Sequence, residues 1–300
     1  MNYTKPPLTI ADQADLLLSR GLISRRAILM DRLSQVNYYR LSAYWYPFRM
    51  PDGEALNSGT TLDVVWDRYV FDRHLRLSVM DAVERVEVSV KTRLANTLAL
   101  RYGPFGYLES ANLPNLASSQ FAVLIGKLNQ EICRSKTPFV AHYKAKYTRE
   151  PRLPIWMAVE IMDFGSMLTL YRGCESFTKR QIAADYGLSG KVMESWLMSL
   201  NYVRNICAHH GRLWNQTLSV SPVIPALKNN KDFHLPVAVP PNTTFAILSV
   251  LSYLMNIIAP QSQWKKRLHA LWFVKHPEIP LAQMGFPSDW EKSVLWRNVL

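Results

Sequence analysis

Apolar residues recur along most of this chain at intervals of three and four positions, which is the spacing of an α-helix. The clearest example lies within residues 62–101, where one face carries Val79, Val83, Val86, Val90, Leu94 and Leu98. Charged residues occupy the opposite face, and Gly103-Pro104 follows. This pattern predicts one long helix, or a kinked pair of helices, that ends before Gly103.

The same spacing predicts an all-α fold, because no sustained alternation of apolar and polar residues indicates a strand. Further helices are predicted at 11–20, 24–35, 118–134, 155–172, 178–186, 190–210, 243–258 and 262–274. A turn-rich stretch, MPDGEALNSGT, separates the N-terminal portion from the rest. We therefore expect an N-terminal helical extension over 1–60, a helical core over 61–215 and a C-terminal helical region over 216–300 packed on that core.

The composition adds a globular character and a strong positive charge. Hydrophobic residues make up 48% of the chain and charged residues 19%, which excludes a disordered protein. The net charge of +12, with 21 Arg and 14 Lys, favours an anionic partner, either nucleic acid or an acidic membrane surface. Arginine suits forked phosphate contacts, and we place nucleic acid ahead of the alternative of a merely soluble basic protein.

Neither a secretory signal nor a membrane span is predicted. The most apolar run, 245–259, is too short to cross a bilayer and carries polar residues on one stripe, so we expect a buried helix. Cys133, Cys174 and Cys207 are far apart and odd in number, so no disulfide framework can be derived from them. These features favour a cytoplasmic protein.

The residues that could carry out chemistry lie on the predicted helix from Lys191 onward. Its apolar face carries Val192, Met193, Trp196, Leu197, Leu200, Val203 and Cys207. Arg204 falls on the same face, where a guanidinium is costly unless it meets an anion. Two partners remain open: a buried acid such as Glu84 or Glu87, or a phosphate that enters a cleft.

His209 and His210 follow in the last turn, and Gly211 is expected to end the helix. The negative end of the helix dipole favours a protonated imidazole, which can act as a general acid or base. Together with Arg204, such a histidine could cleave RNA without a metal, through attack of the 2′-hydroxyl on the adjacent phosphorus.

Two structural alternatives compete with this interpretation. Arg204 can be an ion-pair residue and the histidines simple helix-end caps. A zinc site at Cys207, His209 and His210 lacks four converging ligands, so no metal site is predicted. A geometric difficulty also arises, because a separation of five positions along the sequence places Arg204 and His209 about 140° apart around the axis of an ideal helix. Either the helix loosens near Ala208, or a second copy in a homodimer completes a composite site.

Five blocks of this sequence resemble the Abi-like (AbiD/AbiF type) abortive-infection family of bacteria, which is similar to the HEPN superfamily. They are NYYRLSAYWYPFR at 37–49, DAVERVEVSVKTRLANTLALRYG at 81–103, PIWMAVEIMDFGSM at 154–167, MESWLMSLNYVRNICAHHGRLWN at 193–215 and MGFPSDW at 284–290. They occur in order and extend over nearly the whole chain.

The resemblance implies a HEPN-like helical core and a metal-independent ribonuclease toxin without cofactors that acts in antiphage defence. HEPN nucleases use an Arg followed after four to six residues by a His. Here four residues separate Arg204 from His209 and five separate it from His210, while Asn205 matches the polar residue after the arginine. The resemblance also implies a homodimer and a small structured RNA as an antitoxin partner.

RNA contacts are expected from arginines outside this segment, namely Arg40, Arg49, Arg73, Arg93 and Arg212. The first two are interleaved with aromatic residues that could stack on unpaired bases, although we expect most of those rings to lie in the core. The main alternative function is a non-catalytic scaffold that binds RNA and dimerises. A regulator that binds duplex DNA lacks a convincing recognition helix.

Overall fold

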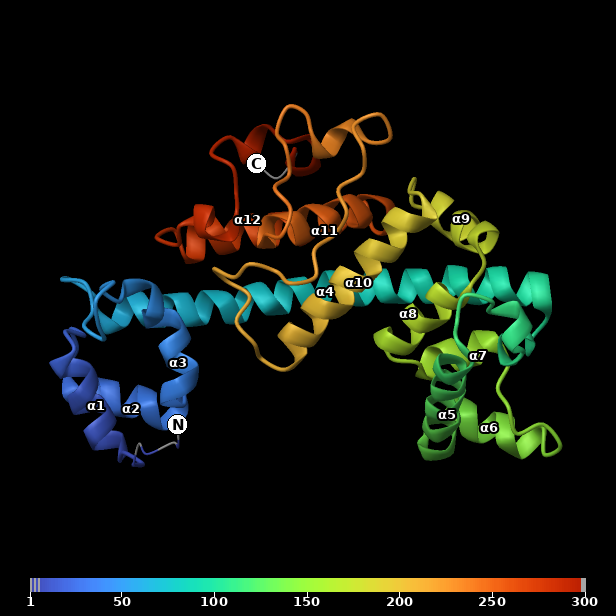
Figure 1. Ribbon diagram of the computed structural model, residues 1–300, viewed down its shortest axis with the longest axis horizontal. Helices are drawn as coiled ribbons and strands as arrows, with labels where there is room; N and C mark the ends of the chain where they lie inside the picture. Colours follow the sequence, from blue (N-terminus) through green and yellow to red (C-terminus); the bar gives the residue numbers. More distant parts are fainter. Residues whose placement is uncertain (1, 3, 5, 298–300) are drawn as a thin grey trace. The chain divides into compact units, whose positions relative to one another are not determined.

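The fold consists of helices and the loops between them in a computed structural model that describes residues 2, 4 and 6–297 (Figure 1). Within these residues the extended backbone pairs only at two isolated bridges, Ile23 with Thr61 and Arg49 with Leu56. The all-α fold is therefore confirmed. In the same residues no helix combines the length and apolarity that crossing a membrane requires.

The helices mostly match the predicted ranges. They are α1 (Ile10–Ser19), α2 (Arg26–Gln35), α3 (Tyr38–Trp45), α4 (Leu62–Tyr102), α5 (Ser118–Arg134), α6 (Pro138–Lys146), α7 (Ile155–Ile161), α8 (Phe164–Gly173), α9 (Ser176–Ala184), α10 (Gly190–Ala208), α11 (Thr244–Ile258) and α12 (Trp264–Ala270). The range 62–101 forms one helix, α4, and not a kinked pair. A π-helical turn, Leu271–Lys275, follows α12.

The range 155–172 is two helices, so the prediction of one helix there is wrong. Met162 has extended backbone angles, and Asp163 begins α8 as its N-cap, with its carboxylate accepting from the Ser166 backbone N–H at 2.8 Å. Aspartate is a strong N-cap residue because its side chain satisfies a backbone donor that has no partner inside the helix. The carboxylate also accepts a bond from Lys127 of α5 at 2.6 Å.

The chain divides into two compact units. Unit 1 comprises residues 1–76 and 270–279, and unit 2 comprises 77–269 and 280–300. In unit 1, α1 packs against α2, and α3 buries Leu41, Tyr44 and Trp45. The Tyr44 hydroxyl donates to buried Asp72 at 2.6 Å, and Asp72 also forms an ion pair with Arg76. This network fastens α3 to the first part of α4.

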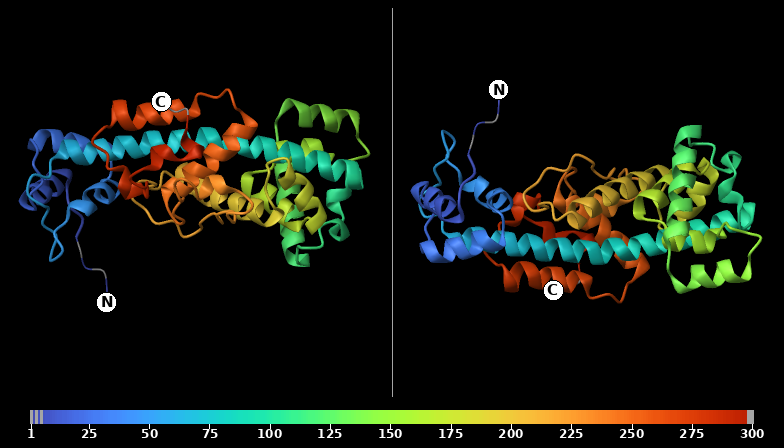
Figure 2. Two further views of the ribbon diagram at one scale, coloured as in Figure 1. Left: turned by 90° about the horizontal axis from the view of Figure 1, so that it is seen from above. Right: turned by 90° about the horizontal axis from the view of Figure 1, so that it is seen from below.

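In unit 2, α10 lies against α8, α9 and α11 (Figure 1). The predicted buried helix is α11, which fixes the C-terminal segment: Ser252 donates to the Leu295 carbonyl at 2.6 Å, and Trp296 donates to Ser249 at 3.1 Å. Both views in Figure 2 show α12 beside α4, where the Trp264 indole donates to the Ser78 carbonyl at 2.7 Å. These contacts fix α11, against which α10 packs.

Candidate active site

Helix α10 is fixed by its apolar face, as the sequence predicts. Ser189 caps its first turn by accepting from the Val192 backbone N–H at 3.3 Å. All seven residues of the predicted apolar face are buried: Val192, Met193, Trp196, Leu197, Leu200, Val203 and Cys207. The Trp196 indole also donates to the Val223 carbonyl at 2.8 Å. A helix anchored in this way presents its remaining residues at defined positions.

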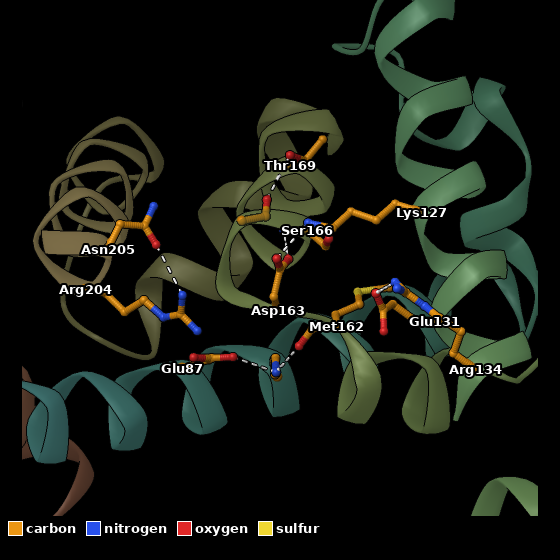
Figure 3. Close-up of polar contacts among 12 residues, drawn as sticks. Glu87, Lys127, Glu131, Arg134, Met162, Asp163, Ser166, Thr169, Arg204 and Asn205 are labelled. Atoms are coloured by element: carbon orange, nitrogen blue, oxygen red, sulfur yellow. Dashed lines mark hydrogen bonds and ion pairs between the residues drawn. The ribbon is translucent and has the colours of Figure 1, made fainter. Parts of the chain in front are cut away.

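Arg204 is half-buried, and its guanidinium has no carboxylate partner within the described residues. It donates instead to the Asn205 side-chain oxygen at 3.2 Å (Figure 3). Glu87 pairs with Lys91 at 2.7 Å, and Glu84 is exposed and forms no ion pair with Arg204. Of the two partners left open by the sequence, neither glutamate neutralises Arg204. An arginine whose charge no carboxylate offsets can bind an anion at low desolvation cost.

The helix ends in a different way from the prediction. His210, and not Gly211, adopts the left-handed conformation, with φ of 58°. The His210 N–H donates to the Cys207 carbonyl at 3.1 Å, and the Gly211 N–H donates to the Ile206 carbonyl at 2.7 Å. These two bonds form a Schellman motif with His210 in the position that glycine usually occupies. Histidine is among the residues that adopt this conformation more often than most.

Both histidines are exposed, so the tip of α10 can be reached by a nucleotide. The helix stays regular up to Ala208, and the His209 N–H donates to the Asn205 carbonyl at 3.0 Å. The helix is therefore regular as far as Ala208, and His209 is its C-cap. The separation of about 140° between Arg204 and His209 remains, so one copy of α10 does not present both on one face.

The other predicted RNA contacts are divided between the units. In unit 2, Arg212 is half-buried just after the histidines, and Arg93 pairs with Asp185 at 3.3 Å. Unit 1 contains the other three: Arg40 and Arg73 are exposed on α3 and α4, and Arg49 lies over the Tyr46 ring. Of the aromatic residues around Arg40 and Arg49, Tyr39 and Tyr46 are exposed, whereas Tyr44 and Trp45 are buried.

The positive charge of the chain belongs mainly to the unit that contains α10. Unit 2 has 24 Lys and Arg against 14 Asp and Glu, a difference of +10, and unit 1 has 11 against 9. A polyanion is therefore attracted chiefly to unit 2.

Sequence reasoning missed a groove beside α10. It has a volume of about 670 Å³ and lies within unit 2, where α5, α8 and α10 meet. Asn201 contributes from α10, one turn before Arg204 and Asn205. The other lining residues come from positions as far apart as 115 and 194, so no local sequence signal reports the groove.

A family model described as Abi-like protein matches residues 31–215, which is more than half of the chain and includes α10 entirely. No curated protein and no solved structure matches the chain.

Proposed function

Because the chain belongs to the Abi-like protein family, we propose that it is an endoribonuclease that acts as a toxin in abortive infection. Family membership suggests the abortive-infection role, and the chemistry is inferred from α10. One observation carries the proposal: Arg204, which has no carboxylate partner among the described residues, is followed one turn later by two exposed histidines. The net charge of unit 2 supports RNA as the substrate.

In the proposed reaction, the 2′-hydroxyl of RNA attacks the adjacent phosphorus and the 5′-oxygen leaves. The products are a 2′,3′-cyclic phosphate and a 5′-hydroxyl. His209 transfers a proton, and Arg204 stabilises the negative charge that develops on the non-bridging oxygens. Asn205 holds the guanidinium through the 3.2 Å bond, and His210 assists the second proton transfer. No step assigns a role to a metal.

The active form is proposed to be a homodimer. Because α10 is regular up to Ala208, its own histidine lies about 140° around the helix from Arg204. A second copy related by a twofold axis can supply the missing face, so that Arg204 of one chain acts with His209 of the other. This arrangement needs no distortion of the helix.

The test compares the full-length chain with Arg204→Ala and His209→Ala. We expect the wild type to arrest bacterial growth, and the purified protein to produce cyclic-phosphate RNA ends in the presence of EDTA. Each substitution should lower cleavage at least roughly 100-fold, which is the usual contribution of such groups. Arg180→Ala and His142→Ala remove the same chemistry at exposed positions on α9 and α6, and should retain activity.

Unchanged growth arrest and unchanged RNA ends in both variants would refute the catalytic assignment. Co-expression of Arg204→Ala with His209→Ala tests the dimer, because a mixed dimer contains one complete composite site. Restored cleavage supports the pairing, whereas no restoration from two stable variants contradicts it.

The alternative function is a scaffold that binds and pairs on RNA without cleaving it. The exposed arginines of unit 2 would serve this role equally well. Both functions predict RNA binding that weakens with salt. A wild-type protein that binds RNA but leaves it intact would establish the scaffold. Loss of cleavage with retained binding in His209→Ala would establish the enzyme.

A further inference from the structure

The groove between α5, α8 and α10 has an apolar floor and a polar rim. Leu116, Leu124 and Leu168 form the apolar part, and Val123 is 70% exposed beside them. The rim carries the amides and hydroxyls of Asn115, Ser119, Gln120, Ser166, Thr169 and Asn201. A nucleobase has the complementary design, with flat apolar faces and an edge of hydrogen-bonding groups.

Most of the charge in this groove is paired within the protein. Lys179 pairs with Glu194 at 2.7 Å, and Arg172 lies 3.5 Å from the same carboxylate. Lys127 pairs with Asp163 at 2.6 Å, a contact that Figure 3 shows reaching from α5 to α8. Each cation already meets a carboxylate, but Arg172 and Lys179 share Glu194, so three cations face two carboxylates and a net charge of +1 remains. The groove therefore offers a ligand chiefly hydrogen bonds.

The rim retains both donors and acceptors that the described protein groups do not use. The Asn201 amide forms no hydrogen bond to a described residue, although the residue is half-buried. Gln120 accepts from the Ala117 backbone N–H but leaves its amino group unused, and Asn115 donates to the Cys174 carbonyl but leaves its side-chain oxygen unused. Amides with unused donors and acceptors can distinguish one base from another by its donor and acceptor pattern.

Asn201 also connects the groove to the proposed active site. It lies four residues before Asn205, on the same face of α10, and one turn before Arg204. In the proposed composite site the same copy supplies Arg204, which lies three residues after Asn201, or about 4.5 Å along the helix. This distance suits a nucleotide next to the one that carries the scissile phosphate.

We propose that this groove binds one unpaired base of the RNA substrate and that Asn201 is its main specificity residue. This inference rests on the proposed ribonuclease function. Phosphate contacts fix the position of the strand, and the groove determines where it is cut, because a base that matches the rim places the neighbouring phosphodiester at Arg204.

The test maps cleavage sites in a randomised single-stranded RNA pool. For the wild type we expect a preferred base at one position beside the cut, favoured roughly five- to hundredfold, the discrimination that one good set of base contacts provides. In Asn201→Ala this preference should disappear. Asn201→Asp, which replaces donors with acceptors at nearly the same shape, should select a different base. Asn129→Ala, an exposed asparagine of α5 outside the groove, is the matched control and should keep the preference.

A binding measurement separates this inference from the function on which it rests. Single-base tetranucleotides are titrated into the full-length His209→Ala protein, with and without Asn201→Ala. Base discrimination that depends on Asn201 supports base binding in the groove, even if the wild type never cleaves RNA. In that case the proposed nuclease function is refuted and base binding stands. Cleavage without any base preference, or a preference that survives Asn201→Ala, overturns the groove and leaves the nuclease intact. Neither cleavage nor discrimination refutes both.

Discussion

Asp163 provides a quantitative test of the physical reasoning, because its carboxylate both caps α8 and pairs with Lys127. Burial alone would raise its pKa, but the bonds from Lys127 and Ser166 lower the pKa from 3.8 to about 2. Such a difference corresponds to about 2.4 kcal/mol for a fully buried group. The side chain is 44% exposed, so solvent screening reduces the contribution of the charge to about 1 kcal/mol.

Three substitutions divide this contribution into its parts. Asp163→Ala removes the cap and the charge, and should lower the free energy of unfolding by about 2 kcal/mol. Asp163→Asn keeps an N-cap side chain and should lose about 1 kcal/mol, while Lys127→Met should lose about 0.5–1 kcal/mol. In a unit of this size, 1 kcal/mol shifts the melting temperature by about 2–4 °C.

The assay is urea unfolding of the full-length chain between pH 7 and pH 2. Because the folded pKa of Asp163 lies below its unfolded value, the charge stabilises the fold above about pH 4, and this contribution is lost as the pH falls through about 2. The difference between the wild type and Asp163→Asn should therefore shrink toward zero at the acidic end. An equal loss in the Asn and Ala variants, or a difference that does not change with pH, would refute the reasoning.

Two further predictions concern the end of α10 and the core of unit 1. His210→Gly should be as stable as the wild type or more stable in thermal melts, because glycine avoids the cost of about 1–2 kcal/mol that other residues have in the left-handed conformation. His210→Val should be less stable. A marked loss of stability in the Gly variant would show that the imidazole itself holds the turn. Asp72→Asn should lower the free energy of unfolding in urea by about 3–5 kcal/mol, because it leaves the Arg76 guanidinium buried without its charge partner. The double variant Asp72→Leu with Arg76→Met should recover most of that loss. A double variant as unstable as the single one would contradict this account.

The fold class and most helix positions could be predicted from the sequence, because the spacing of apolar residues in a long amphipathic segment identifies it as a helix. Two errors have local causes. Apolar residues lie on both sides of Asp163, at Ile161, Met162 and Phe164, so periodicity alone joins α7 to α8, although the Asp163 cap separates them. Helix α6 buries only Val140 and Tyr143, which is too few for a visible pattern.

Only the part of the candidate active site that lies on a single helix could be predicted from the sequence. Arg204 and His209 belong to a single segment, so their spacing was visible. Whether Glu87 neutralises Arg204 depends on a competing partner, Lys91, which no spacing reveals. The groove was hidden for a related reason, since Gln120, Thr169 and Asn201 meet only when three helices pack together.

The uneven distribution of charge between the units has a consequence for assembly. If two copies pair through α10, each brings a unit with an excess of +10 toward the other, and the two units repel each other at low ionic strength. A nucleic acid strand held between them acts as the counterion that relieves this repulsion. RNA binding and subunit association then become thermodynamically coupled, so that binding of a shared strand favours the pair over the separate monomers.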